Sequence, residues 1–218
     1  MNNALYSASL MCGNFLNMSA DLKILAANGV KSIHVDVMDG HFVPNIAFGF
    51  DAINQMKALS FKKNIHLMMN TPSLAIRSIR QNKNDTFLFH IECNENPENL
   101  IDLIGDTAKK GIVINPDTDP ATILPYLTKI DHVMLMCIIP GFYGQQFIEN
   151  SYKKAETVVE MVQKYNPQLT VGVDGGIGKE QILRFYDIGI NHFVLGTRAL
   201  YNRASLSSNI KKLPKLVK

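Results

Sequence analysis

One stretch decides how this chain can fold: His34-Val35-Asp36-Val37-Met38-Asp39-Gly40-His41-Phe42-Val43-Pro44-Asn45. Over residues 33–38, branched apolar residues alternate with His34, Asp36 and Met38. That period of two is typical of a β-strand, in which side chains two residues apart share a face. We therefore expect His34, Asp36 and Met38 to point to one side of a strand and the apolar residues to the other.

The pair of polar side chains on that strand needs an explanation. A histidine and an aspartate inside an apolar segment are costly to bury without partners. A metal ion or a reacting substrate would offset that cost. A core histidine hydrogen-bonded to a neighbouring aspartate explains the pair equally well, so the stretch alone leaves both interpretations open.

Composition limits the class of protein. The chain has 218 residues, of which 46% are hydrophobic, and this is enough for one well-cored domain over residues 1–218. A net charge of +3 does not favour nucleic acid or a membrane surface as a partner, and no apolar stretch approaches membrane-spanning length. The first residues show no signal-peptide pattern, and the three cysteines are far apart. We expect free thiols and a cytoplasmic location.

The rest of the chain reads as alternating strands and helices. The predicted strands are residues 5–10, 31–38, 64–69, 86–91, 112–115, 132–138, 169–174 and 192–195. The predicted helices are residues 21–28, 50–59, 72–81, 97–109, 120–127, 151–165 and 179–186, with most of the chain after residue 195 also helical. No linker or low-complexity segment interrupts this order.

Eight strand–helix units in this length predict an α/β protein with a (β/α)8 TIM barrel. A doubly wound open sheet is the alternative, but it requires a glycine-rich turn after its first strand. Residues 10–14, Leu-Met-Cys-Gly-Asn, do not match that turn. In a barrel the catalytic residues lie at the carboxyl ends of the strands and in the loops that follow.

Polar residues gather at those predicted strand ends. Strand two carries His34 and Asp36, strand three carries His66, and strand seven ends at Asp174. Two imidazoles and two carboxylates form a plausible set of ligands for a divalent metal. Strands two and three are neighbours in a barrel, while strand seven approaches from across the mouth, so Asp36 and Asp174 could flank a bound substrate.

Four other histidine and glutamate residues are less informative. His90 and Glu92 close the fourth strand, where they could orient a metal ligand or play a structural part. His132 and His192 begin their strands, at the end away from the expected chemistry. We interpret both as structural.

Glycines follow the last two strands. Residues 174–178, Asp-Gly-Gly-Ile-Gly, come after strand seven, and Gly196-Thr197 comes after strand eight. Barrels often bind phosphate at these two loops through backbone N–H groups and the N-terminus of a short helix. Ordinary turns are also rich in glycine, so the position of these glycines carries the inference rather than their number.

Six motifs spread over nearly the whole chain match a known family. They are Ser7-Ala8-Ser9-Leu10, the run from His34 to Asn45, His66-Leu67-Met68, the loop from Pro140 to Gln145, Val173-Asp174-Gly175-Gly176, and Gly196-Thr197. On these motifs the chain resembles the ribulose-phosphate 3-epimerase family. The twelve-residue run is the most specific of the six.

The resemblance implies a metal-dependent inversion at carbon 3 of a phosphorylated ketose through an enediolate. His34, Asp36, His66 and Asp174 would hold one divalent metal ion, with zinc the first expectation and iron, manganese or cobalt also compatible. Asp36 and Asp174 would act as the acid–base pair on the two faces of the substrate. A homo-oligomer is usual in the family, and we expect one here.

The resemblance also implies a substrate-binding set. Ser9 would hydrogen-bond the substrate, and Met38, Met68 and Met136 would pack over its reacting carbons. Glycines and one threonine of the loops would complete the pocket and contact the phosphate; they are Gly141, Gly144, Gly175, Gly176, Gly196 and Thr197. Ordinary core packing is the alternative for the methionines.

The identity of the ketose is a separate question. Ala8, Ile139 and Tyr143 depart from the usual pattern of the family, and the last two lie in the loop that would border the substrate. Residues 9–12 and 196–202 look more like the D-allulose-6-phosphate 3-epimerase branch, so we expect conversion of D-allulose 6-phosphate to D-fructose 6-phosphate. D-ribulose 5-phosphate, giving D-xylulose 5-phosphate, is the alternative substrate.

Two further interpretations stay open at this point. A phosphosugar-binding barrel without catalysis would belong to another functional class, although it has no need of two opposed acids. A barrel of a different phosphate-binding enzyme family would be expected to lack a tightly bound divalent metal.

Overall fold

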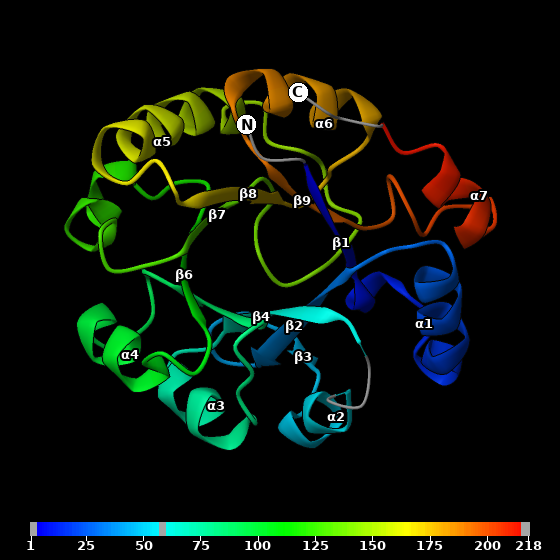
Figure 1. Cartoon of the computed structure of the whole chain (residues 1–218), viewed down its shortest axis with the longest axis horizontal. Helices are drawn as coiled ribbons and strands as arrows, with labels where there is room; N and C mark the ends of the chain where they lie inside the picture. The colour runs from blue at the N-terminus through cyan, green and yellow to red at the C-terminus, as the bar shows by residue number, and fades with distance from the viewer. Residues whose placement is uncertain (1–3, 57–59, 215–218) are drawn as a thin grey trace.

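A closed barrel of parallel strands forms the centre of the protein (Figure 1). The structure is a computed structural model that describes residues 4–56 and 60–214. The barrel strands are β1 (Leu5–Ser9), β2 (Ser32–Asp39), β4 (Lys62–Met68), β5 (Thr86–His90), β6 (Lys109–Ile114), β7 (His132–Met136), β8 (Thr170–Asp174) and β9 (His192–Leu195). β1 pairs with β2 on one side and with β9 on the other, which closes the ring. The predicted (β/α)8 TIM barrel is confirmed.

Helices surround this barrel (Figure 1). They are α1 (Met18–Ala27), α2 (Phe50–Gln55), α3 (Pro72–Ser78), α4 (Pro97–Ile104), α5 (Ser151–Tyr165), α6 (Lys179–Ile188) and α7 (Leu206–Lys211), together with the 3-10 helices η1 (Leu10–Cys12), η2 (Phe15–Asn17) and η4 (Pro120–Tyr126). A short strand, β3 (Ile46–Ala47), pairs antiparallel with the end of β2. Among the described residues, no helix is both long enough and apolar enough to cross a membrane.

Local sequence signals explain where several helices begin and end. α3 and α4 start with proline in the first turn, where a missing N–H costs nothing. The Asn96 side chain accepts a hydrogen bond from the backbone N–H of Glu98 and so caps α4. α6 ends at Gly189, whose left-handed φ of 116° is a conformation that glycine adopts readily.

Three predicted segments differ from the structure. The helix predicted for residues 97–109 ends at Ile104, because Gly105 takes φ +56° and leaves the helical conformation. Residues 109–111 already belong to β6, so Gly111 is a strand residue and does not end a helix. After residue 195 only Leu206–Lys211 is helical among the described residues. α2 ends at Gln55, and residues 57–59 of the predicted helix lie outside the described residues.

The other boundaries agree within three residues. The first strand stops at Ser9, because Leu10 begins the 3-10 turn η1. The segment predicted as a helix at residues 120–127 is the 3-10 helix η4, and it holds Pro125 inside it. Proline cannot donate the backbone hydrogen bond of an α-helix interior, which accounts for the tighter and shorter element.

The inward-facing side chains of the barrel form three layers, since alternate residues of each strand share a face. At the amino end lies a polar layer of Ser7, Ser32, Asn64, His132 and His192, joined by hydrogen bonds. A separate buried apolar cluster comes next and reaches up to the cavity at the carboxyl end, which Met136, Ile138 and Val194 also line; it comprises Leu88, Val113, Met134, Met136, Ile138 and Val194. The third layer lies at the carboxyl ends of the strands and holds the candidate active site.

Candidate active site

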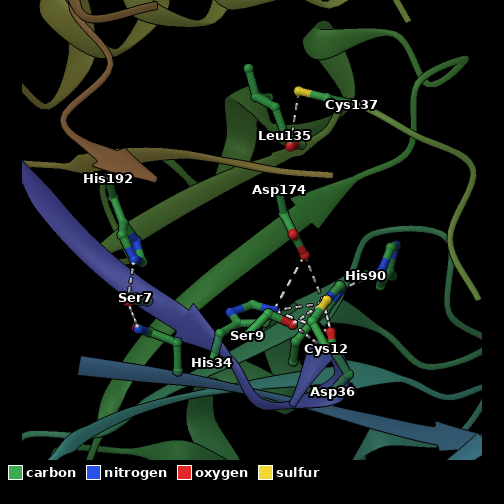
Figure 2. A network of polar contacts seen from close by, with 12 residues as sticks. Ser7, Ser9, Cys12, His34, Asp36, His90, Leu135, Cys137, Asp174 and His192 are labelled. Atoms are coloured by element: carbon green, nitrogen blue, oxygen red, sulfur yellow. Dashed lines mark hydrogen bonds and ion pairs between the residues drawn. The ribbon is translucent and has the colours of Figure 1, made fainter. Parts of the chain in front are cut away.

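Four side chains converge at the carboxyl end of the barrel. His34 and Asp36 come from β2, His66 from β4 and Asp174 from β8. His34 Nε2 lies 3.2 Å from Asp36 Oδ1 and 3.3 Å from Asp174 Oδ2, while His66 Nδ1 lies 3.1 Å from Asp36 Oδ1 and 3.6 Å from Asp174 Oδ2. Figure 2 shows Asp174 reaching down toward His34 and Asp36.

This cluster fits a divalent metal ion. Within residues 4–56 and 60–214 it is the one group of histidine, cysteine, aspartate and glutamate side chains that could hold a metal, with one ligand atom from each residue and all four atoms within 4.8 Å of one another. Two imidazole nitrogens and two carboxylate oxygens suit zinc, iron, manganese or cobalt. The sequence-based prediction of these four residues as neighbours therefore agrees with the structure.

Charge and burial act together in the cluster. His34 and His66 are fully buried, and Asp36 is 5% exposed. Burial alone would lower the pKa of His34, but the carboxylates of Asp36 and Asp174 outweigh it and raise the pKa to about 10. Burial would likewise raise the pKa of Asp36, yet the two imidazoles hold it well below its usual range. The two carboxylates thus favour a cation between them.

A cavity opens above this cluster. Asp36 and Asp174 face it, while His34 and His66 lie beneath it. All ten residues predicted to bind substrate line its walls; they are Ser9, Met38, Met68, Met136, Gly141, Gly144, Gly175, Gly176, Gly196 and Thr197. Ser9 Oγ also donates a hydrogen bond to Asp36 Oδ2 over 3.3 Å. The cavity is therefore polar at its floor and apolar on one side.

Glycines bring the backbone close to the cavity on its other side. Gly175 has φ +101°, and a Cβ there would lie 2.4 Å from Ile138 Cγ1. A Cβ at Gly196 would lie 2.9 Å from Cys12 Sγ. Neither position can accept a side chain without movement of its neighbours. The loop after β8, which leads into α6, and the loop after β9 can therefore present backbone N–H groups to a ligand.

The loop after β7 borders the same cavity. Asn45 Nδ2 donates a hydrogen bond of 2.8 Å to the backbone oxygen of Gly141, which links this loop to the loop between β2 and β3. Ile139 and Tyr143, the residues that depart from the family pattern, are 65% and 57% exposed. Tyr143 lines the cavity, whereas Ile139 does not.

His90 contacts the cluster through His66, and Glu92 contacts His90. His90 Nε2 lies 2.8 Å from His66 Nε2, and His90 Nδ1 lies 3.1 Å from Glu92 Oε2. Burial lowers the pKa of His90 to about 4. The sequence left their role open, and the structure connects both to a candidate metal ligand.

The remaining histidines and cysteines do not join the cluster. His132 and His192 lie in the polar layer at the opposite end of the barrel, where Nδ1 of His192 is 3.2 Å from Nε2 of His132. Cys12 lines the cavity, but burial raises the pKa of its thiol to about 11. Burial raises the pKa of Cys137 to about 12. Neither thiol is readily ionised near pH 7.

Sequence reasoning missed several contributors. Met11, Phe142 and Ile177 line the cavity, although each follows a strand rather than ending one. Lys154 was not singled out because it lies inside the amphipathic pattern of α5. Its ammonium group is turned inward, where it donates to backbone oxygens of Asn115, Pro116 and Thr118. No local signal distinguishes a lysine with that role from a solvated one.

The fold and the cluster define a class: a (β/α)8 barrel enzyme with a candidate divalent-metal site at the carboxyl mouth. Residues 6–201 match the model of the ribulose-phosphate 3 epimerase family, and the chain belongs to this family. It is an enzyme of the isomerase class that epimerises carbohydrate phosphates.

Curated relatives agree over nearly the whole chain. The chain is 31% identical over 215 residues to a ribulose-phosphate 3-epimerase of Aquifex aeolicus (strain VF5), covering 98% of this chain and 96% of the relative. It is 34% identical over 191 residues to that of Treponema pallidum (strain Nichols), with 87% and 88% covered. For Bacillus subtilis (strain 168) the identity is 31% over 208 residues, with 94% and 95% covered.

Solved structures with low sequence identity share the fold. A mutant tryptophan synthase α-subunit from Pyrococcus furiosus aligns with a TM-score of 0.67 at 13% identity, covering 98% of this chain and 99% of that one. A likeness at that identity supports the barrel alone. The family assignment therefore rests on the sequence comparisons.

Proposed function

We propose that the protein interconverts D-ribulose 5-phosphate and D-xylulose 5-phosphate with the help of one divalent metal ion. The observation that carries this proposal is the placement of two carboxylates at the floor of one cavity. Asp36 and Asp174 come from β2 and β8, which are separated around the barrel by β9 and β1. Both lie within 3.3 Å of the same atom, His34 Nε2.

Two opposed carboxylates suit inversion of a carbon next to a ketone. One aspartate removes the proton at carbon 3 from one face, and the other aspartate returns a proton to the opposite face. The roles exchange when the reaction runs backwards. Ser9, hydrogen-bonded to Asp36, fixes the orientation of that carboxylate and offers its hydroxyl group to the substrate.

His34, Asp36, His66 and Asp174 would hold the metal ion. When bound, a divalent ion supplies Lewis-acid stabilisation of the negative charge that develops on the substrate oxygens. We expect zinc from the two imidazole ligands, with iron, manganese and cobalt as alternatives. Met38, Met68 and Met136 exclude water from the reacting carbons without offering competing donors.

The phosphate group of the substrate is assigned to the glycine-lined side of the cavity. Gly144, Gly175, Gly176 and Gly196 leave room for close approach to backbone N–H groups, and Thr197 adds a hydroxyl group. The N-terminus of α6 follows directly, with Gly178 at its N-cap position. A helix N-terminus favours an anion through its unpaired N–H groups and its dipole.

The five-carbon substrate is supported by the names of the curated relatives described above. The expectation of allulose 6-phosphate rests on residues 9–12 and 196–202 and has no support among those relatives. Tyr143, which departs from the family pattern, lines the cavity in which either sugar would bind. Allulose 6-phosphate is therefore the competing substrate in the decisive experiment.

Proton exchange at carbon 3 tests the proposal. Zinc- or manganese-loaded protein is incubated in heavy water with ribulose 5-phosphate and, separately, with allulose 6-phosphate. NMR then follows the carbon-3 proton and the epimeric product. Faster exchange with ribulose 5-phosphate supports the proposal, while faster exchange with allulose 6-phosphate reverses the substrate assignment. Binding of both sugars with no exchange would mean a non-catalytic phosphosugar-binding barrel.

A further inference from the structure

A chain of hydrogen bonds leads away from the metal-binding cluster through β5 and the loop after it. His66 Nε2 lies 2.8 Å from His90 Nε2, and His90 Nδ1 lies 3.1 Å from Glu92 Oε2. Glu92 Oε1 in turn accepts a hydrogen bond of 2.8 Å from the backbone N–H of Asn115 and another from the Thr118 hydroxyl. His66 and His90 are fully buried, so the contacts between them are not shared with bulk water.

The donor and acceptor of each hydrogen bond can be assigned by starting at Glu92, the end of the series away from the metal-binding cluster. The backbone N–H of Asn115 can only donate, so Glu92 must accept there. An ionised carboxylate is an acceptor at both oxygens, so His90 donates to it from Nδ1. A neutral imidazole carries one N–H, and His90 Nε2 is therefore an acceptor. His66 must then donate from Nε2, so its Nδ1 is the nitrogen that faces the cluster.

Nδ1 of His66 contacts the other candidate ligands. The Asp36 carboxylate can accept a proton from Nδ1 in the metal-free protein, and a bound metal ion would replace that proton. His66 Nδ1 lies 3.2 Å from His34 Nε2 and 3.1 Å from Asp36 Oδ1. We propose that His90 and Glu92 are positioning residues that keep a proton on His66 Nε2, so that Nδ1 is the nitrogen left to bind the metal ion. This inference rests on the proposed metal-dependent function, but it concerns metal binding and not the choice of sugar.

Lys154 holds the loop at residues 115–118, which hydrogen-bonds to Glu92. Lys154 Nζ, from α5, donates to the backbone oxygens of Asn115 at 2.7 Å, Pro116 at 2.6 Å and Thr118 at 2.5 Å. Lys154 is only 8% exposed. Its three bonds hold the loop whose N–H and hydroxyl groups define the orientation of Glu92. Partners of this kind, one step removed from the ligand, commonly change metal affinity about 10- to 100-fold when they are removed.

The Glu92→Gln variant tests the proposal because it reverses the donor and acceptor roles in the hydrogen bonds from Glu92 through His90 to His66. The Asn115 N–H requires the amide oxygen of the introduced glutamine as its acceptor, and the amide NH₂ of that side chain then faces His90 Nδ1. His90 becomes a donor at Nε2, and the His66 proton moves to Nδ1, where it blocks the metal ligand. We expect zinc affinity, measured by competition with a chromogenic chelator, to fall about 10- to 100-fold.

The proton on His66 Nε2 can be read directly by ¹⁵N NMR of the metal-free protein. The six histidines give a spectrum small enough to assign. We expect a proton on His66 Nε2 in the wild type and no proton on Nε2 in the Glu92→Gln variant. A wild-type His66 without a proton on Nε2 would overturn the proposal whether or not any variant folds.

Glu95→Gln is the matched control. Glu95 lies in the same loop and accepts a hydrogen bond from the backbone N–H of Ser73, on a different element from the histidines. This variant should keep wild-type zinc affinity and the wild-type His66 spectrum. A Glu92→Gln variant whose zinc affinity equals that of the wild type would show that Glu92 is only structural. Both readouts are independent of turnover, so failure of the proposed reaction would be recognised separately.

Discussion

At the scale of single residues, Asp36 and Asp174 separate an epimerase from a passive binder. We expect Asp174→Asn and Asp36→Asn to lower kcat by about 10²- to 10⁴-fold, as is typical when an acid–base group is lost. Asn keeps the size of the side chain, so phosphosugar binding measured by calorimetry should persist. Asp106→Asn, on a fully exposed side chain, is the control. Unchanged turnover in both site variants would remove the acid–base assignment.

Gly175 is the second residue that carries a prediction. A Cβ there meets Ile138 at 2.4 Å and the backbone has φ +101°, so Gly175→Ala combines a steric clash with backbone strain. We expect the free energy of unfolding in urea to fall by about 2–4 kcal/mol. Gly29→Ala provides the comparison, because Gly29 has φ +78° but no described atom within 4 Å. Equal losses in the two variants would mean that the clash is relieved without cost.

At the scale of elements, the polar layer at the amino ends of β7 and β9 makes stability depend on pH. Burial lowers the pKa of His132 to about 3 and that of His192 well below 6.5. Below about pH 6.5 the unfolded chain binds protons that the folded protein excludes. The stability that these neutral histidines contribute is therefore fully present above about pH 6.5 and is lost as the pH falls toward the folded pKa values.

The contribution of one of these histidines can be isolated. We expect His132→Gln to reduce the slope of unfolding free energy against pH, between about pH 6 and 4, by up to about 1.4 kcal/mol per pH unit. Chemical denaturation at several pH values gives this slope. Thr157→Ser, on the exposed side of α5, changes no titratable group and should leave the slope unchanged. A His132→Gln slope identical to that of the wild type would contradict the excluded-proton explanation.

Element boundaries show where sequence patterns stop being informative. Alternation over residues 33–38 identified β2 because one face had to be polar and the other apolar. No comparable period marks the end of α4, where Gly105 and Gly111 are equally plausible stops. Only the tertiary structure distinguishes the two glycines. A Cβ at Gly111 would lie 2.4 Å from the side chain of Leu88, its partner on the neighbouring strand β5.

At the scale of the whole molecule, the candidate metal site joins three strands and should therefore stabilise the barrel when it is filled. A ligand that binds the folded state alone adds about 2.7 kcal/mol at one hundred times its Kd. We expect zinc to raise Tm and a chelator to lower it, measured by differential scanning calorimetry. In His66→Gln the same zinc addition should shift Tm much less. A wild-type Tm that does not change with zinc would argue against the site.

Most residues of the candidate active site could be predicted from the sequence, because the topology of the whole barrel brings them together. A barrel places the carboxyl ends of all its strands around one mouth, so His34, Asp36, His66 and Asp174 could be brought together from strand order alone. The contacts of Glu92 with Asn115, and of Lys154 with the loop beyond it, could not. They depend on how one loop turns, and neither residue interrupts the pattern of its own segment.

The pairing of β1 with β9, which closes the barrel, has a consequence for synthesis of the protein. β1 hydrogen-bonds to both β2 and β9. During synthesis the edge of β1 that pairs with β9 therefore stays unpaired until β9, the last barrel strand, has left the ribosome. Until β9 has emerged, that edge offers unpaired N–H and C=O groups to other nascent chains. A polypeptide cut short before β9 therefore cannot close, and such a truncation should yield aggregates rather than a smaller functional enzyme.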